Sequence, residues 1–253
     1  MLLCIFNLSA FAIEYDSTRL DTVKKSRIKS TFLYTKIYRA APYALPAVMA
    51  GYGFLSLENA VVENTDEHIH HEMMEKYRGF QTSLDDKLQY APAVAVYTLN
   101  IIGVKSKNNF IDRSAMYLMS MALAGHTVDI IKKHSGKQRP AGDNFRSFPS
   151  GHTANAFAAA EFMRMEYKHI SPWYGLAAYS VASATGTLRL MNNRHWFSDV
   201  VAGAGIGILS TKAAYIAYPW LKKTIIGKKD LNFIATPTLE GNTVGLYFAV
   251  PLK

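Results

Sequence analysis

The chain has 253 residues, of which 49% are apolar and 19% are charged. This composition excludes an intrinsically disordered chain, and the single cysteine, Cys4, excludes an internal disulfide framework. The net charge of +9 favours anionic partners, either phosphorylated molecules or an anionic membrane surface. Because the sequence contains no nucleic-acid-binding motif, no nucleic-acid partner is expected.

The first 39 residues combine an apolar start with a basic segment. Residues 1–12 end in Ala10-Phe11-Ala12, which resembles a signal-peptidase site, but the basic start that is typical of a secretory signal is missing. A cleaved signal and an uncleaved anchor are both open. Cleavage would leave the basic segment outside, so we expect an uncleaved start that faces the inside of the cell.

Six stretches of the following chain are mainly apolar and are predicted to be helices. They span residues 40–57, 88–104, 114–131, 152–168, 171–188 and 200–221. Their lengths lie near the lower limit of roughly 17 residues for crossing a bilayer. We therefore expect an all-α fold, a membrane-embedded bundle of about six helices, with a soluble helical protein as the alternative.

The linkers between these stretches alternate in character. Basic residues gather before residue 40 and at 105–113, 164–168 and 222–229. The intervening linkers are acidic or polar, at 58–87, 132–151 and 189–199. Six crossings would place all the basic linkers on one side, which is the pattern of loops that stay inside the cell. The polar loops then lie on the outer side.

The tail changes character after residue 230. Residues 232–236 and 243–250 are strand-like, and Glu240-Gly241-Asn242 between them is a turn signal. The sequence thus predicts three parts. They are an N-terminal apolar start and basic segment (1–39), a helical domain (40–221, with its motifs at about 110–220) and a short C-terminal β-hairpin (231–253).

The two outer polar loops carry residues suited to binding a phosphoryl group. Lys132, Arg139 and Arg189 are cations close to predicted helix ends. Forked guanidinium donors match the oxygens on which charge gathers during phosphoryl transfer, and a lysine ammonium adds a point charge. Ser150 and Gly151 precede a predicted helix, whose free backbone N–H groups would face an anion.

Two histidines and an aspartate supply reactive groups. His195 and Asp199 are four residues apart and face each other if a helix begins at His195. A carboxylate bonded to one ring nitrogen fixes the tautomer and makes the other nitrogen more nucleophilic. His152 is then free to give a proton to the leaving oxygen. Each cluster alone has an ordinary structural interpretation, as a solvated loop, a helix cap or an ion pair, but their joint occurrence favours chemistry.

Together these clusters resemble the three-part signature of the type 2 phosphatidic acid phosphatase superfamily. The matching residues are Lys132-x6-Arg139-Pro140, Pro149-Ser150-Gly151-His152 and Arg189-x5-His195-x3-Asp199. The likeness covers about residues 110–220. One departure is Leu188, where the family usually has a serine of secondary importance.

The resemblance implies a helical core and a phosphatase that uses no metal and no cofactor. By this resemblance His195 forms a phosphohistidine, Asp199 orients it and His152 is the general acid. The residues implied to bind the phosphate are Lys132, Arg139, Ser150, Gly151 and Arg189.

The expected substrate is a phosphorylated lipid, hydrolysed at a bacterial inner membrane with the active site facing the periplasm. Within the family, the chain is most similar to lipid A phosphatases, while undecaprenyl diphosphate and phosphatidylglycerol phosphate are alternative substrates. The other hypotheses are a soluble periplasmic acid phosphatase, a haloperoxidase and a non-enzymatic phospholipid-binding protein. The sequence makes no prediction about oligomeric state.

A cluster of histidines lies apart from these motifs. His68, His70 and His71 stand among glutamates and could bind a metal weakly. The favoured interpretation is a solvated acidic helix.

Overall fold

The computed structural model describes residues 40–225, 234–240 and 243–249. The expected N-terminal segment (1–39) and the turn of the hairpin lie outside the described residues. The chain divides after Leu45 into two units. Of the first unit only the start of a helix at Ala40–Leu55 is described, and the account below concerns the second unit.

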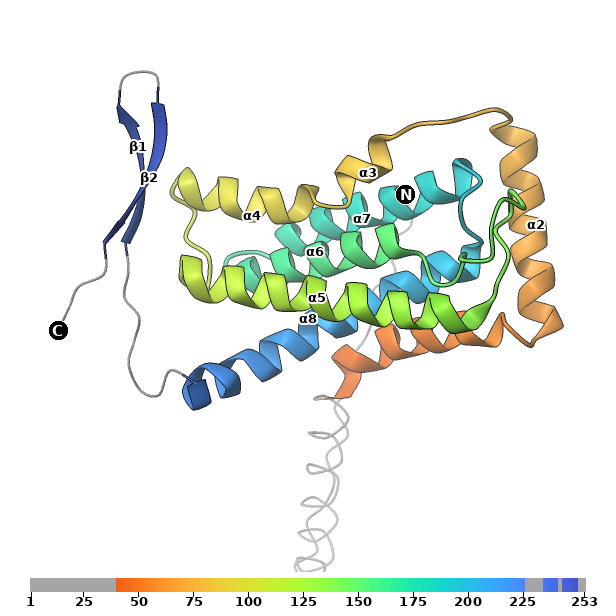
Figure 1. Cartoon of the computed structure of the whole chain (residues 1–253), viewed down its shortest axis with the longest axis horizontal. Helices are drawn as coiled ribbons and strands as arrows, with labels where there is room; N and C mark the ends of the chain where they lie inside the picture. Colours follow the sequence, from red (N-terminus) through yellow and green to blue (C-terminus); the bar gives the residue numbers. More distant parts are fainter. Residues whose placement is uncertain (1–39, 226–233, 241–242, 250–253) are drawn as a thin grey trace, which may run out of the picture. The chain divides into compact units, whose positions relative to one another are not determined.

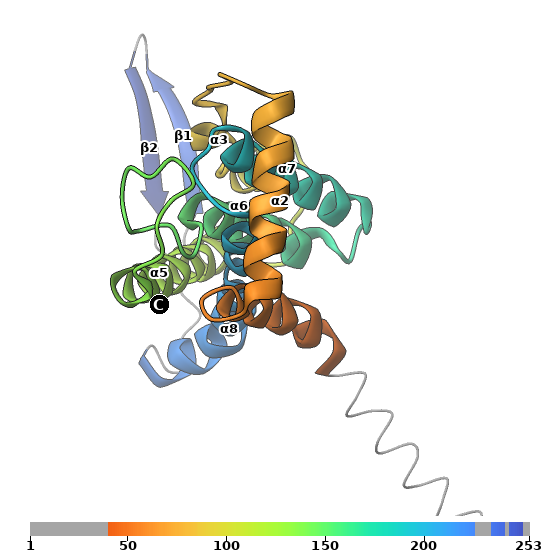
Figure 2. The same cartoon turned by 90° about the vertical axis from the view of Figure 1, so that its right-hand side faces the viewer.

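The described chain is built mainly of helices (Figure 1). After the helix at Ala40–Leu55, these are α2 (Ala60–Lys76), α3 (Leu84–Leu88), α4 (Ala91–Ile101), α5 (Phe110–Ser135), α6 (Gly151–Tyr167), α7 (Trp173–Met191) and α8 (Phe197–Ile225). Helix α6 lies at the centre and packs against α4, α5, α7 and α8. Helix α2 runs across one end of this bundle, where it contacts α7 and α8 (Figure 2).

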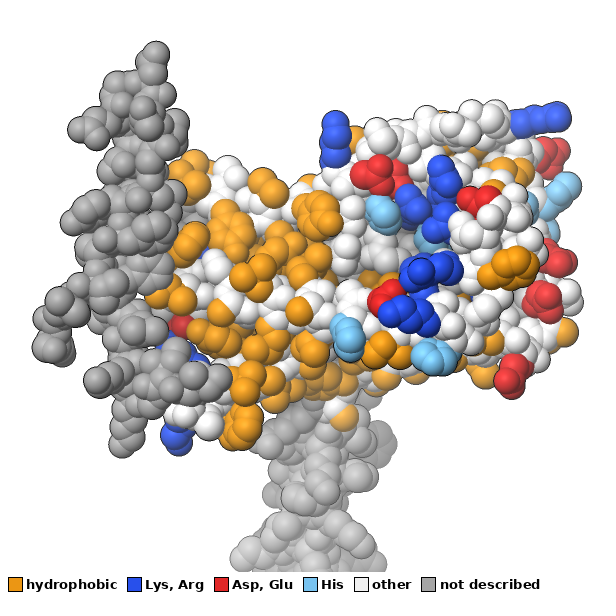
Figure 3. Space-filling view, in the orientation of Figure 1, with side chains coloured by type: hydrophobic (Ala, Val, Ile, Leu, Met, Phe, Trp, Pro, Cys, Tyr) orange, Lys and Arg blue, Asp and Glu red, His pale blue; other side chains and the backbone are white. Residues whose placement is uncertain are grey.

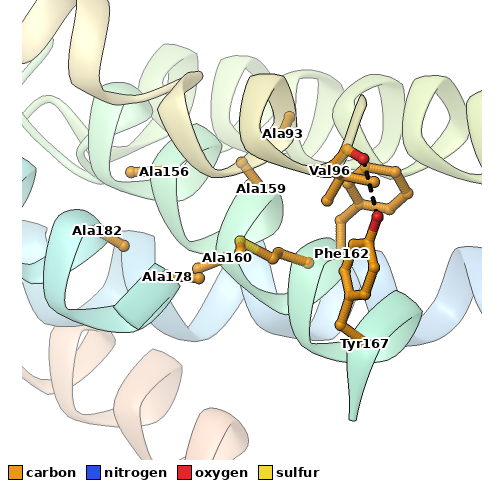
Figure 4. Packing of buried hydrophobic residues seen from close by; sticks show 10 residues of the cluster. Ala93, Val96, Ala156, Ala159, Ala160, Phe162, Tyr167, Ala178 and Ala182 are labelled. Atoms are coloured by element: carbon orange, nitrogen blue, oxygen red, sulfur yellow. Dashed lines mark hydrogen bonds between the residues drawn. The ribbon is translucent and has the colours of Figure 1, made fainter. Parts of the chain in front are cut away.

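Small side chains let the central helices approach closely. The core around α6 is rich in alanine and includes Ala156, Ala159 and Ala160, all fully buried (Figure 4). On α8, a Cβ added to Gly207 would lie 2.2 Å from the carbonyl oxygen of Ala154, so only glycine fits there. Spacing small residues four apart is a common way to bring two helix backbones together.

The predicted fold class, about six helices with a C-terminal hairpin, needs a correction in its number of helices. The described residues form eight, because the acidic segment 58–87 folds into α2 and α3 rather than into a simple connection. Asn59 starts α2 by accepting a hydrogen bond from the backbone N–H of Val61 at 3.0 Å. The all-helical character of residues 40–225 agrees with the prediction.

Two strands follow the helices. Strands β1 (Ile234–Glu240) and β2 (Thr243–Ala249) are antiparallel, with Ile234 opposite Ala249 and Glu240 opposite Thr243. The side chains of these strands lie outside the described part of the structure.

By length and composition, the described helices do not provide the six membrane crossings that the sequence predicts. Among the described residues, only Phe197–Thr224 is long and apolar enough to cross a bilayer, and 61% of its most apolar window is buried inside the protein. The helix at Ala40–Leu55 and α2 pass the same test as a pair, bent by 92°. The predicted crossing at 88–104 shortens to the 11 residues of α4, which span about 16 Å, well short of the roughly 30 Å of a bilayer core.

Candidate active site

The predicted site residues lie where helix ends meet at one end of the bundle. Helix α5 is closed by Gly136 in a left-handed conformation (φ 58°), and Asn193 turns the chain between α7 and α8 with φ 57°. The backbone N–H of Ser150 donates to the carbonyl oxygen of Asp199 at 3.0 Å, which joins the start of α6 to the start of α8. Basic and histidine side chains gather at this end, beside a hydrophobic surface (Figure 3).

His195 and Asp199 form a buried pair. The Nδ1 atom of His195 lies 3.4 Å from Oδ2 of Asp199, and the two side chains are 2% and 0% exposed. The same Oδ2 accepts hydrogen bonds from the Ser147 hydroxyl at 2.5 Å and from the backbone N–H of Trp196 at 3.0 Å. Because Nδ1 faces the carboxylate, Nε2 is the nitrogen left for a substrate.

The surroundings of His195 keep its ring neutral. Burial lowers the pKa of His195 to about 4; Asp199 acts against this shift, while the cations Lys132 and Arg189 act with it. At physiological pH the imidazole is therefore uncharged, which is the form that can attack an electrophile.

Two arginines offer unused donors. The Nε atoms of Arg139 and Arg189 are buried and have no hydrogen-bond partner among the described residues. Arg189 is held from another side, since its Nη1 donates to Oδ2 of Asp85 at 2.6 Å. Arg139 has only a distant contact with Asp143, at 3.8 Å. A buried donor without a partner is costly, so both Nε–H groups are suited to an anion such as phosphate.

Lys132 adds a third cation, from the last turn of α5. Its Nζ donates to the backbone carbonyls of Arg146 at 2.8 Å and Ser147 at 3.1 Å. Burial lowers the pKa of Lys132 to about 8, with nearby arginines lowering it as well and Asp199 raising it. The ammonium is charged at neutral pH and can lose its proton only slightly above it.

The start of α6 faces a cavity of about 710 Å³. Ser150 caps the helix, and its Oγ lies 2.9 Å from Oγ1 of Thr153. His152 and Arg189 line the cavity, and Nε2 of His152 lies 2.7 Å from Oδ1 of Asp86. His195 is buried and does not line the cavity. The structure thus brings the eight predicted residues to one end of the bundle, where His152 and Arg189 line the cavity.

Sequence reasoning missed five residues of this site. They are Asp66, Asp85, Asp86, Lys137 and Ser147. Three of them come from the acidic segment 58–87, which lies outside the resemblance. The density of acidic residues in this segment could have indicated them, because buried cations need carboxylate partners.

The histidine cluster on α2 has structural contacts. Nε2 of His70 lies 2.8 Å from Oδ1 of Asn193, and its ring lies 5.2 Å from that of Trp196. His68 lies 3.5 Å from Glu72 on the exposed face of the helix. The described residues contain no group of three or more metal-ligating side chains suited to a metal ion.

Comparison with known proteins supports the resemblance. Residues 114–223 match the PAP2 superfamily. A lipid A 1-phosphatase of Porphyromonas gingivalis is 39% identical over 180 residues, which are 70% of this chain and 40% of that protein. A probable diacylglycerol pyrophosphate phosphatase of Schizosaccharomyces pombe is 36% identical over 87 residues, 30% of each chain. The chain thus spans less than half the length of either relative.

One solved structure gives a weaker match. It is the transmembrane PAP2 type phosphatidylglycerolphosphate phosphatase of Bacillus subtilis, with 18% identity and a TM-score of 0.48. The match covers 74% of this chain and 98% of that one.

Proposed function

Because the chain belongs to the PAP2 superfamily, we propose that it is a phosphatase that hydrolyses a phosphomonoester of a membrane lipid, with lipid A as the first candidate. The observation that carries this proposal is the buried His195–Asp199 pair beside the unused Nε–H groups of Arg139 and Arg189. A nucleophile and anion donors in one place suit phosphoryl transfer.

The reaction proceeds in two steps. In the first, Nε2 of His195 forms a bond to phosphorus, the bond from phosphorus to the lipid oxygen breaks, and His152 gives its proton to that oxygen. The phosphoryl oxygens are held by Arg139, Arg189 and Lys132, together with the backbone N–H groups at the start of α6. In the second step a water molecule, losing a proton to His152, attacks phosphorus and releases inorganic phosphate from His195.

Asp199 fixes the orientation of the nucleophile. With Ser147 and the backbone N–H of Trp196 on the same oxygen, the carboxylate has one position in which to meet Nδ1 of His195. It also stabilises the charge that the ring gains when Nε2 bonds to phosphorus.

The choice of a lipid substrate is supported by the relative from Porphyromonas gingivalis and by the exposed hydrophobic surface beside the basic end. Large apolar side chains on three helices of the bundle are exposed: Val94, Ile101, Leu118, Leu123 and Leu176. Contiguous apolar surface of this kind marks contact with a membrane or a lipid.

We place the protein in the bacterial inner membrane with its site toward the periplasm. The site lies at the ends of α5 and α7 and at the starts of α6 and α8. At the opposite ends of these helices lie Lys107, Lys168, Lys222 and Lys223. Because lysines are enriched in cytoplasmic loops, these residues support a cytoplasmic location for the end of the bundle opposite the site.

The test is phosphate release by the full chain purified in detergent. We expect release from lipid A, with mass spectrometry of the product identifying the phosphate removed. His195→Ala should abolish it, whereas His169→Ala, an exposed histidine at the other end of α6, should not. Phosphate release from undecaprenyl diphosphate or phosphatidylglycerol phosphate, and not from lipid A, would assign that lipid as the substrate. Release from none of these lipids would contradict the proposal.

A further inference from the structure

Behind the His195–Asp199 pair lies a second buried carboxylate. Asp66, on α2, is 3% exposed. Its Oδ1 accepts from the backbone N–H of Ser198 at 2.8 Å, and its Oδ2 accepts from the Ser198 hydroxyl at 2.5 Å. These contacts tie α2 to the first turn of α8, one residue before Asp199.

Lys137 stands between the two carboxylates. Its Nζ lies 2.9 Å from Oδ2 of Asp66 and 3.3 Å from Oδ1 of Asp199. The same Nζ donates to the hydroxyl of Ser56 at 3.0 Å and to that of Ser198 at 2.8 Å. One ammonium is thus shared by two buried carboxylates.

This sharing determines how much negative charge Asp199 presents to His195. If Lys137 were paired with Asp199 alone, it would draw that carboxylate away from the imidazole and weaken the support for a charged ring. If Lys137 were absent, Asp199 would act on His195 at full strength. Asp66 sets the balance because its carboxylate lies closer to the ammonium than Asp199 does, at 2.9 against 3.3 Å.

We propose that Asp66 and Lys137 are positioning residues that tune the Asp199 carboxylate and, through it, the nucleophile His195. Helix α2 is then a working part of the active site, although it lies outside the matched residues 114–223. The proposal rests on the proposed function only in taking His195 as the nucleophile.

Other charges also act on these groups. His195 is faced by Asp199 from α8, Lys132 from α5 and Arg189 from α7. Lys137 is faced by the carboxylates of Asp66 and Asp199, and by the rings of Phe148 and Trp196 at 5.9 and 6.0 Å. The variants below leave all three direct neighbours of His195 unchanged.

The experiment measures the titration of His195 itself. The full chain in detergent micelles, with labelled histidine, is titrated by NMR, and the signal of His195 is assigned from its loss in His195→Gln. This measurement needs no turnover and no substrate, so it is independent of whether lipid A is hydrolysed.

The two single variants should shift this titration in opposite directions. Lys137→Met removes a positive charge from Asp199 and should raise the pKa of His195 by about half a unit or more. Asp66→Asn leaves Lys137 entirely to Asp199 and should lower it. Lys137→Arg keeps the charge and should restore most of the original value.

Matched controls use neighbouring exposed residues. Glu75→Gln on α2 and Lys133→Met on α5 remove the same charges at exposed positions, and should leave the pKa of His195 unchanged. Shifts in the same direction for Asp66→Asn and Lys137→Met, or no shift in either, would overturn the proposal.

A rate measurement supplies a second check. With a soluble phosphomonoester, we expect kcat to fall about 10-fold or more in each single variant, because either change moves the Asp199 carboxylate from its position beside His195. KM should change little, because neither residue touches the phosphate. The double variant Asp66→Asn/Lys137→Met should be no slower than the slower single variant, since residues that act through one carboxylate are not additive. If the double variant were slowed by the product of the two single effects, the two residues would not act through the same carboxylate, and the proposal would be contradicted.

Discussion

Among the cations of the proposed phosphate site, the Lys132 ammonium is the one whose charge depends on pH near neutrality. Its burial and the neighbouring arginines lower its pKa to about 8, while guanidinium groups stay charged throughout the accessible range. The cation is present below this pH and is lost as the pH rises through it.

We predict that kcat/KM falls as the pH rises through about 8, because deprotonated Lys132 no longer attracts a phosphate. In Lys132→Arg the charge persists, so the alkaline limb should move to higher pH even if the maximal rate is lower. The pH at which kcat/KM falls is measured from pH–rate profiles of both proteins on one substrate. An alkaline limb at the same pH in both would assign it to another group.

The arginines should contribute through their unused donors. We predict that Arg139→Ala or Arg189→Ala lowers kcat/KM by at least about 10²-fold, which is typical for removing a donor to a developing charge. Vanadate, a phosphate mimic, should inhibit the unaltered protein and bind these variants more weakly. Arg78→Ala, an exposed arginine beyond the end of α2, serves as the control and should retain both properties.

At the residue scale, the sequence predicted those site residues that lie a few positions apart in one motif. His195 and Asp199 are related by one helical turn, so their meeting could be expected from spacing alone. Asp66, Asp85 and Asp86 could not be found in this way, because their partners lie far along the chain and no local spacing relates them. The catalytic roles of the predicted residues stay predictions until variants are measured.

Among the elements, the contact between α6 and α8 holds the site together. Gly203 faces the cap of α6, and a Cβ added there would lie 2.5 Å from the carbonyl oxygen of Ser150. Backbone atoms cannot move at that distance without a large cost, so a larger residue would push the start of α6 away from Asp199.

We predict that Gly203→Ala lowers both the thermal midpoint and the activity. Gly125→Ala on α5 is the matched control, because an added Cβ there meets nothing within 4 Å. It should be neutral or stabilising by up to about 1 kcal/mol, the helix-propensity difference between the two residues. Thermal unfolding and phosphate release, measured on both variants, separate the two cases. Equal effects of the two substitutions would show that the close approach at Gly203 is unimportant.

The sequence also predicted where the elements of the central bundle occur, since its mainly apolar stretches overlap α4 to α8. It did not predict α2 and α3, because a polar segment has no apolar stripe to mark a helix. The stretch at 88–104 was too long because apolar residues continue past the end of α4, where Gly103 has a positive φ of 96°.

For the whole molecule, buried polar groups explain why few helices look like membrane spans. Glu161 is fully buried in α6 and receives hydrogen bonds from Arg164 at 2.6 Å, while Lys212 of α8 lies 2.8 Å away. Such paired charges lower the mean hydropathy of helices whose outer faces are apolar. Hydropathy alone therefore underestimates contact with lipid when the polar groups face the interior.

We predict that the full chain sediments with membranes after carbonate extraction and is released only by detergent. Topology can be tested in a Cys4→Ser background with single cysteines at Phe145, near the site, and at Lys105, near the opposite end. A membrane-impermeant maleimide added to intact spheroplasts should label Phe145→Cys, and should label Lys105→Cys only after permeabilisation. The reverse pattern would place the site on the cytoplasmic side.

The hydrogen bond between His152 and Asp86 has a consequence for the resting protein. Asp85 and Asp86 already contact Nη1 of Arg189 and Nε2 of His152, so a phosphate that reaches these two atoms must displace carboxylates. These carboxylates are built-in counterions that compete with weakly bound anions of the surroundings. Only a ligand with enough charge, anchored by the rest of its own structure, can complete the exchange.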